Sequence, residues 1–280
     1  MTKEKLIVAD SPLSEVSINR WRGDDVIEAS DRIAEETPIA LIYNGVSHAV
    51  MLATPQDLED FALGFSLSEG ILQHKSELYD LEIVVQAEGI ELRMDIVTEC
   101  FVKLKEKRRN LVGRTGCGLC GAESLSQALR LPAKNKASNE TDVGLENVIH
   151  AASIQAAFQA IQTKQILQQA TGATHACAWV NAEGDVALLR EDVGRHNAMD
   201  KLIGALAKAP QQQKGFVLTS SRASYEMVQK VAMAGFVMLV AISAPTGLAV
   251  RLAKAYGVTL VGFLRQGQFV IYAHAERIKR

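Results

Sequence analysis

The chain contains only four cysteines in 280 residues, and this scarcity excludes the disulfide framework of small secreted domains. It also contains no apolar run long enough to span a membrane, because the best candidate, Phe236–Ala244, has the length of a buried strand. The first five residues, Met-Thr-Lys-Glu-Lys, carry no apolar signal core. We therefore expect a cytoplasmic protein without a membrane partner, and in a reducing compartment a close cysteine pair is typically catalytic or metal-binding.

An excess of positive charge is absent as well, since the formal net charge is -2. General nucleic-acid binders usually carry a large positive excess that neutralises phosphates, so we expect no nucleic-acid partner. A local basic patch can still hold a small phosphorylated ligand. Hydrophobic residues make up 48% and charged residues 22%, a balance that indicates a globular chain of one large domain or two domains.

The first half predicts two β-hairpins with a helix between them. Asn44-Gly45 and Glu88-Gly89 are the turn signals. Thr54, as N-cap, and Pro55, at the first helical position, predict where the helix begins. We interpret residues 1–112 as an N-terminal α+β subdomain. Its predicted strands are Pro38–Tyr43, Val46–Leu52, Leu81–Gln86 and Ile90–Val97.

Residues 148–280 alternate helices with short apolar strands, which is typical of a sheet covered on both faces. A long helix is predicted over Ile149–Ala170 and ended by Thr171-Gly172. The other predicted helices are Asn197–Lys208, Tyr225–Ala234 and Gly247–Tyr256. The predicted strands are His175–Asn181, Asp185–Arg190, Gly215–Thr219, Val237–Ser243, Val258–Phe263 and Phe269–Ala273. Between the two halves, residues 113–147 hold a cysteine loop and a polar linker.

The cysteine loop reads Arg-Thr-Gly-Cys-Gly-Leu-Cys-Gly over residues 114–121, with the thiols of Cys117 and Cys120 three positions apart. Flanking glycines leave both sulfurs uncovered by neighbouring side chains. Arg114, and the positive end of a helix starting near Ala122, would favour the thiolate. A thiolate is the form that attacks a sulfur donor and carries the sulfur as a persulfide.

Spacing alone leaves metal binding, disulfide exchange and sulfur transfer open for this pair. A structural zinc site usually needs four ligands, and the other cysteines, Cys100 and Cys177, stand alone in the sequence and fit small core residues. A thioredoxin-like pair belongs in the strand-to-helix turn of a small fold, which this sequence does not show.

Polar clusters follow four predicted strands of the second half. In α/β sheets, ligands bind beyond the carboxyl ends of strands, where helix N-termini favour phosphate. Asp192 could accept hydrogen bonds from a guanine edge, and arginines could hold phosphates. Each feature alone is weak, because Ser and Thr before helices are mostly N-caps and His196 fits a capping role. The clusters are Arg190–Asn197, Thr219–Arg222, Ser243–Gly247 and Phe263–Gln268, with arginines at 190, 195, 222 and 265.

Residues 114–121 resemble the signature of the formate dehydrogenase accessory sulfurtransferases, the FdhD family. Glu191–Ala198, Thr219–Arg222 and Leu260–Phe263 resemble that family as well, in order, and the match runs from about Pro38 to Ala275. The resemblance implies a three-layer α/β/α, cytidine-deaminase-like domain behind a smaller α+β subdomain, and a homodimer.

The resemblance also implies a function. Such proteins take sulfur from a cysteine desulfurase and pass it to the molybdenum (or tungsten) bis-guanine-dinucleotide cofactor of formate dehydrogenase. Cys117 matches the persulfide carrier and Cys120 its helper, and no permanently bound metal is expected. The expected cofactor-binding residues are Asp192, Arg195, Ser220, Ser221, Arg222, Phe263, Leu264, Arg265, Gln266, Gly267 and Gln268.

Two alternatives stay open at this point. A non-catalytic chaperone would bind the cofactor and a partner enzyme and use the cysteines only for contact. A zinc deaminase would need a His-x-Glu pair followed by Pro-Cys-x-x-Cys. His274-Ala275-Glu276 has the first spacing, but it follows the cysteines, and no proline precedes Cys117.

Overall fold

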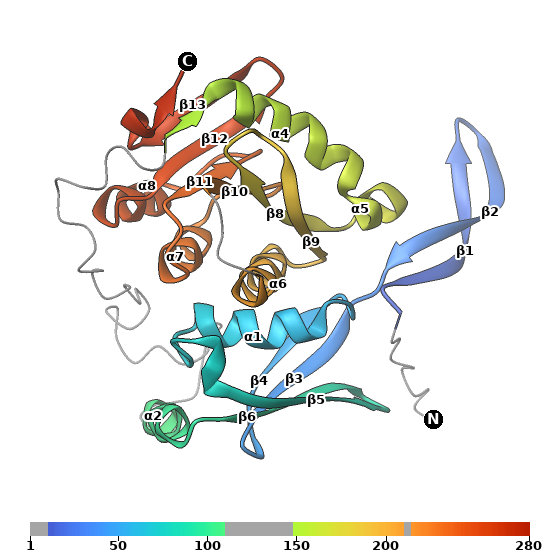
Figure 1. Cartoon of the computed structure of the whole chain (residues 1–280). Coiled ribbons are helices and arrows are strands. Elements are labelled where there is room, and N and C mark those ends of the chain that lie inside the picture. The colour runs from blue at the N-terminus through green and yellow to red at the C-terminus, as the bar shows by residue number, and fades with distance from the viewer. Residues whose placement is uncertain (1–10, 110–147, 210–213) are drawn as a thin grey trace.

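A computed structural model describes residues 11–109, 148–209 and 214–280. Two sheets organise the chain, a four-stranded sheet in the N-terminal part and a six-stranded sheet in the C-terminal part (Figure 1). Cys117 and Cys120 lie outside the described residues, as does the whole predicted loop and linker over 113–147. The boundaries predicted at 112 and 147 therefore stay predictions. Within the described part, no helix is long and apolar enough to cross a membrane.

The four-stranded sheet has the order β4-β3-β6-β5 and packs one face against helix α1. Alternate residues of β3, namely Ile39, Leu41 and Tyr43, are fully buried on that face. The opposite face exposes Val50 and Leu52 to solvent. The elements are β3 (Thr37–Tyr43), β4 (Val46–Ala53), α1 (Leu58–Ser68), the short 3-10 helix η1 (Lys75–Glu77), β5 (Leu78–Gln86), β6 (Gly89–Ile96) and α2 (Thr98–Arg109).

The first predicted hairpin is confirmed, and the predicted helix start is wrong. Asn44 and Gly45 both have positive φ, 46° and 76°, as a two-residue hairpin turn favours. Helix α1, however, begins at Leu58 and not at Pro55. Thr54 is fully buried, and its backbone N–H donates to Asp192 Oδ2 at 3.0 Å. Thr54, which the local sequence pattern predicted to be the N-cap of the helix, is therefore used in a tertiary hydrogen bond instead.

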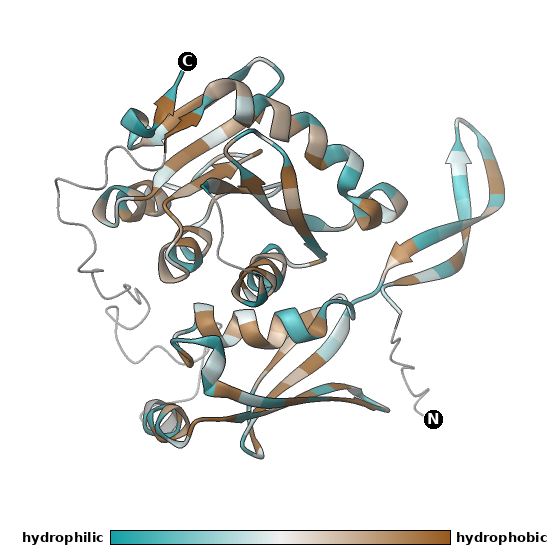
Figure 2. Cartoon of the chain, in the orientation of Figure 1, coloured by the Kyte–Doolittle hydropathy of each residue, from teal (hydrophilic) through white to brown (hydrophobic). Residues whose placement is uncertain are grey.

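The six-stranded sheet has the order β13-β12-β11-β10-β8-β9. Helices α6, α7 and α8 pack on one face and α4 on the other, which confirms the prediction of a sheet covered on both faces. Apolar residues gather on its strands (Figure 2). The specific likeness to cytidine deaminases stays a prediction. The elements are α4 (Ala151–Lys164), α5 (Ile166–Thr171), β8 (His175–Asn181), β9 (Val186–Asp192), α6 (Arg195–Lys208), β10 (Gly215–Thr219), α7 (Tyr225–Met233), β11 (Met238–Ala241), α8 (Gly247–Ala255), β12 (Thr259–Arg265) and β13 (Gln268–Ala273).

The long helix predicted over Ile149–Ala170 is divided in the structure. Its first two residues form β7 (Ile149–His150), which pairs with β14 (Ile278–Lys279), near the 3-10 helix η2 (Ala275–Arg277). The helix then breaks at Gln165, where φ is -81° and ψ is 81°. The carboxylate of Glu191 accepts hydrogen bonds from the backbone N–H groups of Leu167 and Gln168, so a distant side chain starts α5 anew.

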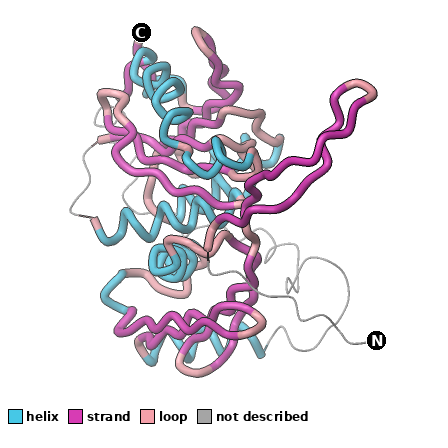
Figure 3. The backbone as a smooth tube through the Cα atoms, turned by 90° about the vertical axis from the view of Figure 1, so that its right-hand side faces the viewer, coloured by secondary structure: helices cyan, strands magenta, loops and turns pink. Residues whose placement is uncertain are grey.

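An antiparallel ribbon of two strands precedes the compact part of the chain and was not predicted from the sequence. It consists of β1 (Leu13–Arg22) and β2 (Asp25–Ala34) and extends away from both sheets (Figure 3). Trp21, next to the turn, is 71% exposed. An isolated two-stranded ribbon is marginally stable in water, so the stability of this ribbon depends on contacts with other parts of the protein more than that of the larger sheets does.

Helices α1 and α6 join the two parts in backbone contact. A Cβ atom built on Gly64 would lie 1.7 Å from the carbonyl oxygen of Asp200, and one built on Gly204 would lie 1.9 Å from that of Asp60. Only glycine fits at this crossing, because any side chain would drive the helices apart. Arg190 adds an ion pair across the joint, with Nη2 at 2.6 Å from Asp60 Oδ2.

We predict that Gly204→Ala lowers the free energy of unfolding by about 3 kcal/mol, because the added methyl group overpacks the crossing. Urea denaturation followed by circular dichroism measures the change. Gly247→Ala is the matched control, since the nearest atom to its new Cβ is Arg251 Nη1 at 3.6 Å. Equal losses in both variants would contradict the proposed role of the crossing.

Candidate functional site

The four polar clusters of the sequence converge on one edge of the six-stranded sheet. Strands β10, β11 and β12 run parallel, and β9 has the same direction because β8 lies antiparallel to both β9 and β10. Their carboxyl ends therefore lie at the same edge of the sheet, where the start of β8 separates the end of β9 from that of β10. We call this region the strand-end edge; it comprises residues 190–197, 219–226, 243–247 and 263–268.

Backbone hydrogen bonds tie the neighbouring ends together. The N–H of Ala223 donates to Ala244 O at 3.2 Å, and the N–H of Thr246 donates to Ala223 O at 3.0 Å. The N–H of Phe263 donates to Ser243 O at 3.1 Å. Loops that follow separate strands are thus held as one surface, on which the N-termini of α6, α7 and α8 meet.

Asp192 is the last residue of β9, the outermost strand on this side of the six-stranded sheet, and it lies below the surface. Its side chain and that of Lys201 are both fully buried, with Lys201 Nζ at 2.7 Å from Asp192 Oδ2. Burial lowers the pKa of Lys201, an effect that the carboxylate opposes. The second oxygen, Oδ1, accepts from the N–H of Gly194 at 2.8 Å and from Asn197 Nδ2 at 3.1 Å. Both oxygens are therefore occupied by internal donors.

Asp192 was expected to accept hydrogen bonds from a guanine edge, but in the structure its carboxylate is buried and both of its oxygens contact internal donors. The rest of the motif over 191–197 is also mostly structural. Glu191 starts α5, and Asn197 Nδ2 donates to Leu52 O at 2.8 Å. Arg190, expected to hold phosphate, is bound to Asp60 instead. Within the motif, Arg195 and His196 are left as the partly exposed side chains that can serve a ligand.

Arg195 lies in the first turn of α6, near the start of β8. Its Nε atom is buried and has no hydrogen-bond partner among the described residues. Burial, and to a lesser extent the charge of Arg195, lowers the pKa of His175. His175 Nδ1 lies 3.5 Å from Ser220 Oγ, which accepts from the N–H of Ala176. A cation, a hydroxyl and an imidazole therefore meet where β8, β9 and β10 end or begin.

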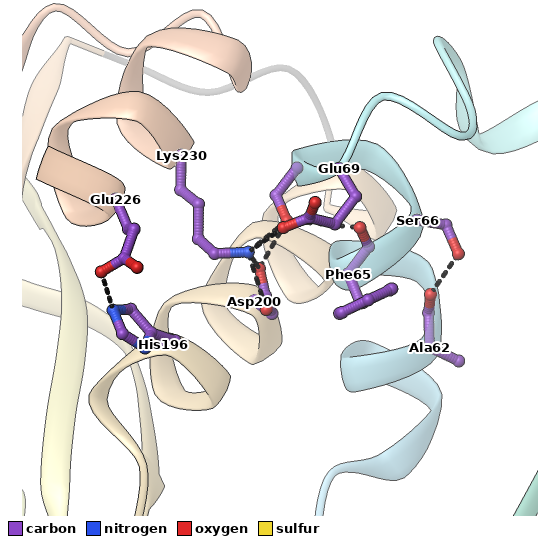
Figure 4. A network of polar contacts seen from close by, with 9 residues as sticks. Ala62, Phe65, Ser66, Glu69, His196, Asp200, Glu226 and Lys230 are labelled. Carbon is purple, nitrogen blue, oxygen red and sulfur yellow. Dashed lines mark hydrogen bonds and ion pairs between the residues drawn. The ribbon is translucent and has the colours of Figure 1, made fainter. Parts of the chain in front are cut away.

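His196 Nε2, on α6, lies 2.9 Å from Glu226 Oε2 of α7 (Figure 4). Contact with His196 lowers the pKa of Glu226 to about 2. One turn further along α7, the buried Lys230 pairs with Asp200 at 2.8 Å. Figure 4 shows both pairs bridging helices α6 and α7, the first near the helix N-termini and the second deeper, toward α1.

The remaining predicted positions divide by exposure. Ser221 is 3% exposed, and its Oγ lies 3.0 Å from Thr219 Oγ1, whereas Arg222 is exposed. Leu264 is fully buried in the core, so only its backbone can reach a ligand. The structure therefore leaves Ser221 and Leu264 without an accessible functional side chain.

The turn between β12 and β13 projects from the strand-end edge. Phe263 has a positive φ of 51° and is 44% exposed. Such a conformation is unfavourable for an aromatic residue and is often found at functional sites. Arg265 Nη1 donates to the backbone oxygens of Ile242 and Leu264, and the exposed Gln266, Gly267 and Gln268 complete the turn.

Three residues of this region were not predicted from the sequence. Lys201 sits among apolar residues of a predicted helix, a pattern that signals a buried lysine with a partner. In the sequence, Glu226 resembles an ordinary acidic residue in the first turn of a helix, and His175 only marks the start of a predicted strand.

His274 and Glu276, considered for a deaminase, contact each other at 3.1 Å beyond the end of β13. Because β13 is antiparallel to β12, that end lies at the opposite edge of the sheet.

The model of the FdhD/NarQ family matches residues 34–279. The chain belongs to the FdhD/NarQ family. It is 56% identical over 269 residues to a protein of Cupriavidus necator named "Sulfur carrier protein FdhD", covering 95% of this chain and 90% of that protein. A protein of the same name from Bordetella petrii is 51% identical, with 95% and 94% covered.

Among solved structures, the fold of this family member is similar to one titled "Crystal structure of a putative formate dehydrogenase accessory protein from Desulfotalea psychrophila". The TM-score is 0.70 at 24% identity, with 95% of this chain and 99% of that chain covered. At that identity the likeness supports the fold alone.

We predict that Asp192→Asn lowers the free energy of unfolding by about 3–5 kcal/mol, because it leaves the buried charge of Lys201 uncompensated. Thermal and urea unfolding measure the loss. The double variant Asp192→Asn/Lys201→Met should recover part of it, since no buried charge then lacks a partner. A double variant as unstable as the sum of the single ones would argue against the pair.

Proposed function

We propose that this protein takes sulfur from a cysteine desulfurase and transfers it to the molybdenum (or tungsten) bis-guanine-dinucleotide cofactor that formate dehydrogenase requires. Cys117 carries the sulfur as a persulfide and Cys120 assists. The cofactor is a substrate, bound at the strand-end edge, and the protein acts as a homodimer. Transfer of the sulfur atom makes the protein a sulfurtransferase.

The convergence of four strand ends is the observation that best supports a binding site there. A ligand with two guanines and two pyrophosphates needs several cationic and backbone N–H contacts. Arg195 and Arg222 supply charge, and three helix N-termini supply backbone donors. The turn over 263–268 adds backbone groups and the exposed Phe263 ring, which can lie against a base.

Family membership supports the sulfur chemistry. The relatives from Cupriavidus necator and Bordetella petrii bear the name of a sulfur carrier, and the similar structure bears that of a formate dehydrogenase accessory protein. In the sequence, Cys117 and Cys120 are the closely spaced thiols, whereas Cys100 and Cys177 are buried. Burial raises the pKa of Cys177 to about 12, which suits an inert core thiol.

We predict that Cys117→Ala abolishes sulfur transfer. Mass spectrometry after incubation with a cysteine desulfurase and cysteine should show one added sulfur on the wild-type protein, located at Cys117, and none at that position in the variant. Formate dehydrogenase produced with the variant should contain cofactor without its terminal sulfur ligand.

The buried Cys177→Ala variant serves as the matched control and should still accept sulfur. Sulfurated cofactor made with Cys117→Ala would refute the carrier mechanism and favour the chaperone. One stoichiometric zinc per chain, by metal analysis, would instead revive the deaminase.

We predict that Arg195→Ala weakens the binding of guanosine diphosphate by about 2 kcal/mol, the contribution of a charge-assisted contact. Isothermal titration calorimetry measures the affinity. Arg93→Ala is the control, because Arg93 is a half-exposed arginine on the four-stranded sheet that pairs with Glu91 and Glu82. If Arg195→Ala bound guanosine diphosphate as tightly as the wild type, the proposal that the cofactor binds at the strand-end edge would be wrong.

A further inference from the structure

We propose that Glu226 is the residue that recognises the guanine base, through its carboxylate, at the strand-end edge. This inference rests on the proposed function and names the specificity element of the same site. It replaces Asp192, whose burial removes it from that role.

Exposure singles out Glu226. The segments that form the strand-end edge contain three carboxylates, those of Glu191, Asp192 and Glu226. Glu191 is 4% exposed and Asp192 is fully buried, and both are bonded to internal donors. The side chain of Glu226 is 54% exposed. It is therefore the carboxylate in these segments that an incoming base can reach.

The contacts of Glu226 fix the carboxylate in place and leave part of it open. Oε2 lies 2.9 Å from His196 Nε2 and accepts from Ser224 Oγ at 3.3 Å. Neither of these contacts uses Oε1. A carboxylate held through one oxygen by two neighbouring residues presents the other as a preoriented acceptor.

The charge of Glu226 matches guanine. With a pKa of about 2, the group is ionised throughout the neutral range and can only accept hydrogen bonds. Guanine presents two adjacent donors, N1–H and the 2-amino group, to such an acceptor. Adenine presents an acceptor at N1, so the same carboxylate would repel it.

Neighbouring groups fit the remainder of a nucleotide. Arg195 is close enough for its charge to contribute to lowering the pKa of Glu226, which places a cation near the base-reading group. Arg222 and the N-termini of α6 and α7 lie on the same edge and suit phosphates. A nucleotide whose base contacts Glu226 can therefore place its phosphates against Arg222 and these helix N-termini.

The test is calorimetry with guanosine, inosine and xanthosine diphosphates on the wild-type protein and on Glu226→Gln. The wild type should prefer guanosine over inosine diphosphate, which lacks the 2-amino donor. Glu226→Gln should bind guanosine diphosphate at least tenfold more weakly and lose that preference. It should also bind xanthosine diphosphate better than the wild type does, because an amide N–H can donate to the 2-oxo group.

Controls separate recognition from stability. Glu59→Gln changes a more exposed first-turn glutamate on α1, whose partner is Lys208 at 3.5 Å, and should leave all three affinities unchanged. A gain for xanthosine diphosphate cannot come from loss of folding. Glu226→Asp, which keeps the charge but withdraws the carboxylate, should bind guanosine diphosphate more weakly than the wild type and still discriminate against xanthosine.

The outcomes distinguish this inference from the proposed function. Unchanged selectivity in Glu226→Gln, with a lowered melting temperature, would make Glu226 only a link between α6 and α7 and leave the proposed site intact. A wild-type protein that binds no guanosine diphosphate would overturn the site and the assignment of Glu226 together.

Discussion

The buried ion pair between Asp192 and Lys201 is the interaction on which the arrangement of this protein depends. Besides binding each other, its members hold Thr54 from both sides: Asp192 accepts from the Thr54 N–H, and Lys201 Nζ donates to Thr54 O at 2.8 Å. Thr54 lies directly between β4 and α1. The pair therefore fixes the entry to α1 relative to α6, the two helices that cross in backbone contact at Gly64 and Gly204. A buried pair of this kind is a weak source of net stability but a strong constraint on which arrangement is adopted.

The same constraint divides the motif over 191–197 into two kinds of residue. Those that face inward (Glu191, Asp192, Gly194 and Asn197) position helices and connect the two parts of the chain. Those that face outward, Arg195 and His196, are presented at the strand-end edge by the first turn of α6. Much of this motif is thus structural, and the polar side chains that it leaves partly exposed are Arg195 and His196, the second of which contacts Glu226 of α7.

The sequence allowed the strands, the turns and the edge of the sheet to be predicted, because these follow from local patterns. Gly172, predicted to end a helix, does so with φ at 68°. The role of Asp192 was not predictable in this way, since Thr54 lies 138 positions away in sequence and no local pattern identifies Asp192 as the partner of Lys201. The break at Gln165 depends on Glu191, 23 or more positions further on. The ribbon of β1 and β2 was not predicted, because apolar and polar residues alternate only weakly along its two strands. Cys117 and Cys120 were identified from their motif, and their placement stays a prediction.

The glycine crossing of α1 and α6 has a consequence for the cysteine segment. Residues 110–147 start after α2, which belongs to the four-stranded sheet, and end before β7, which belongs to the other part of the molecule. The two anchors of that segment therefore sit on different bodies, and backbone contact at Gly64 and Gly204 sets the distance between them. A methyl group added at Gly64 or Gly204 would therefore also change the separation between the end of α2 and the start of β7, the two described elements that flank the cysteine segment in the sequence.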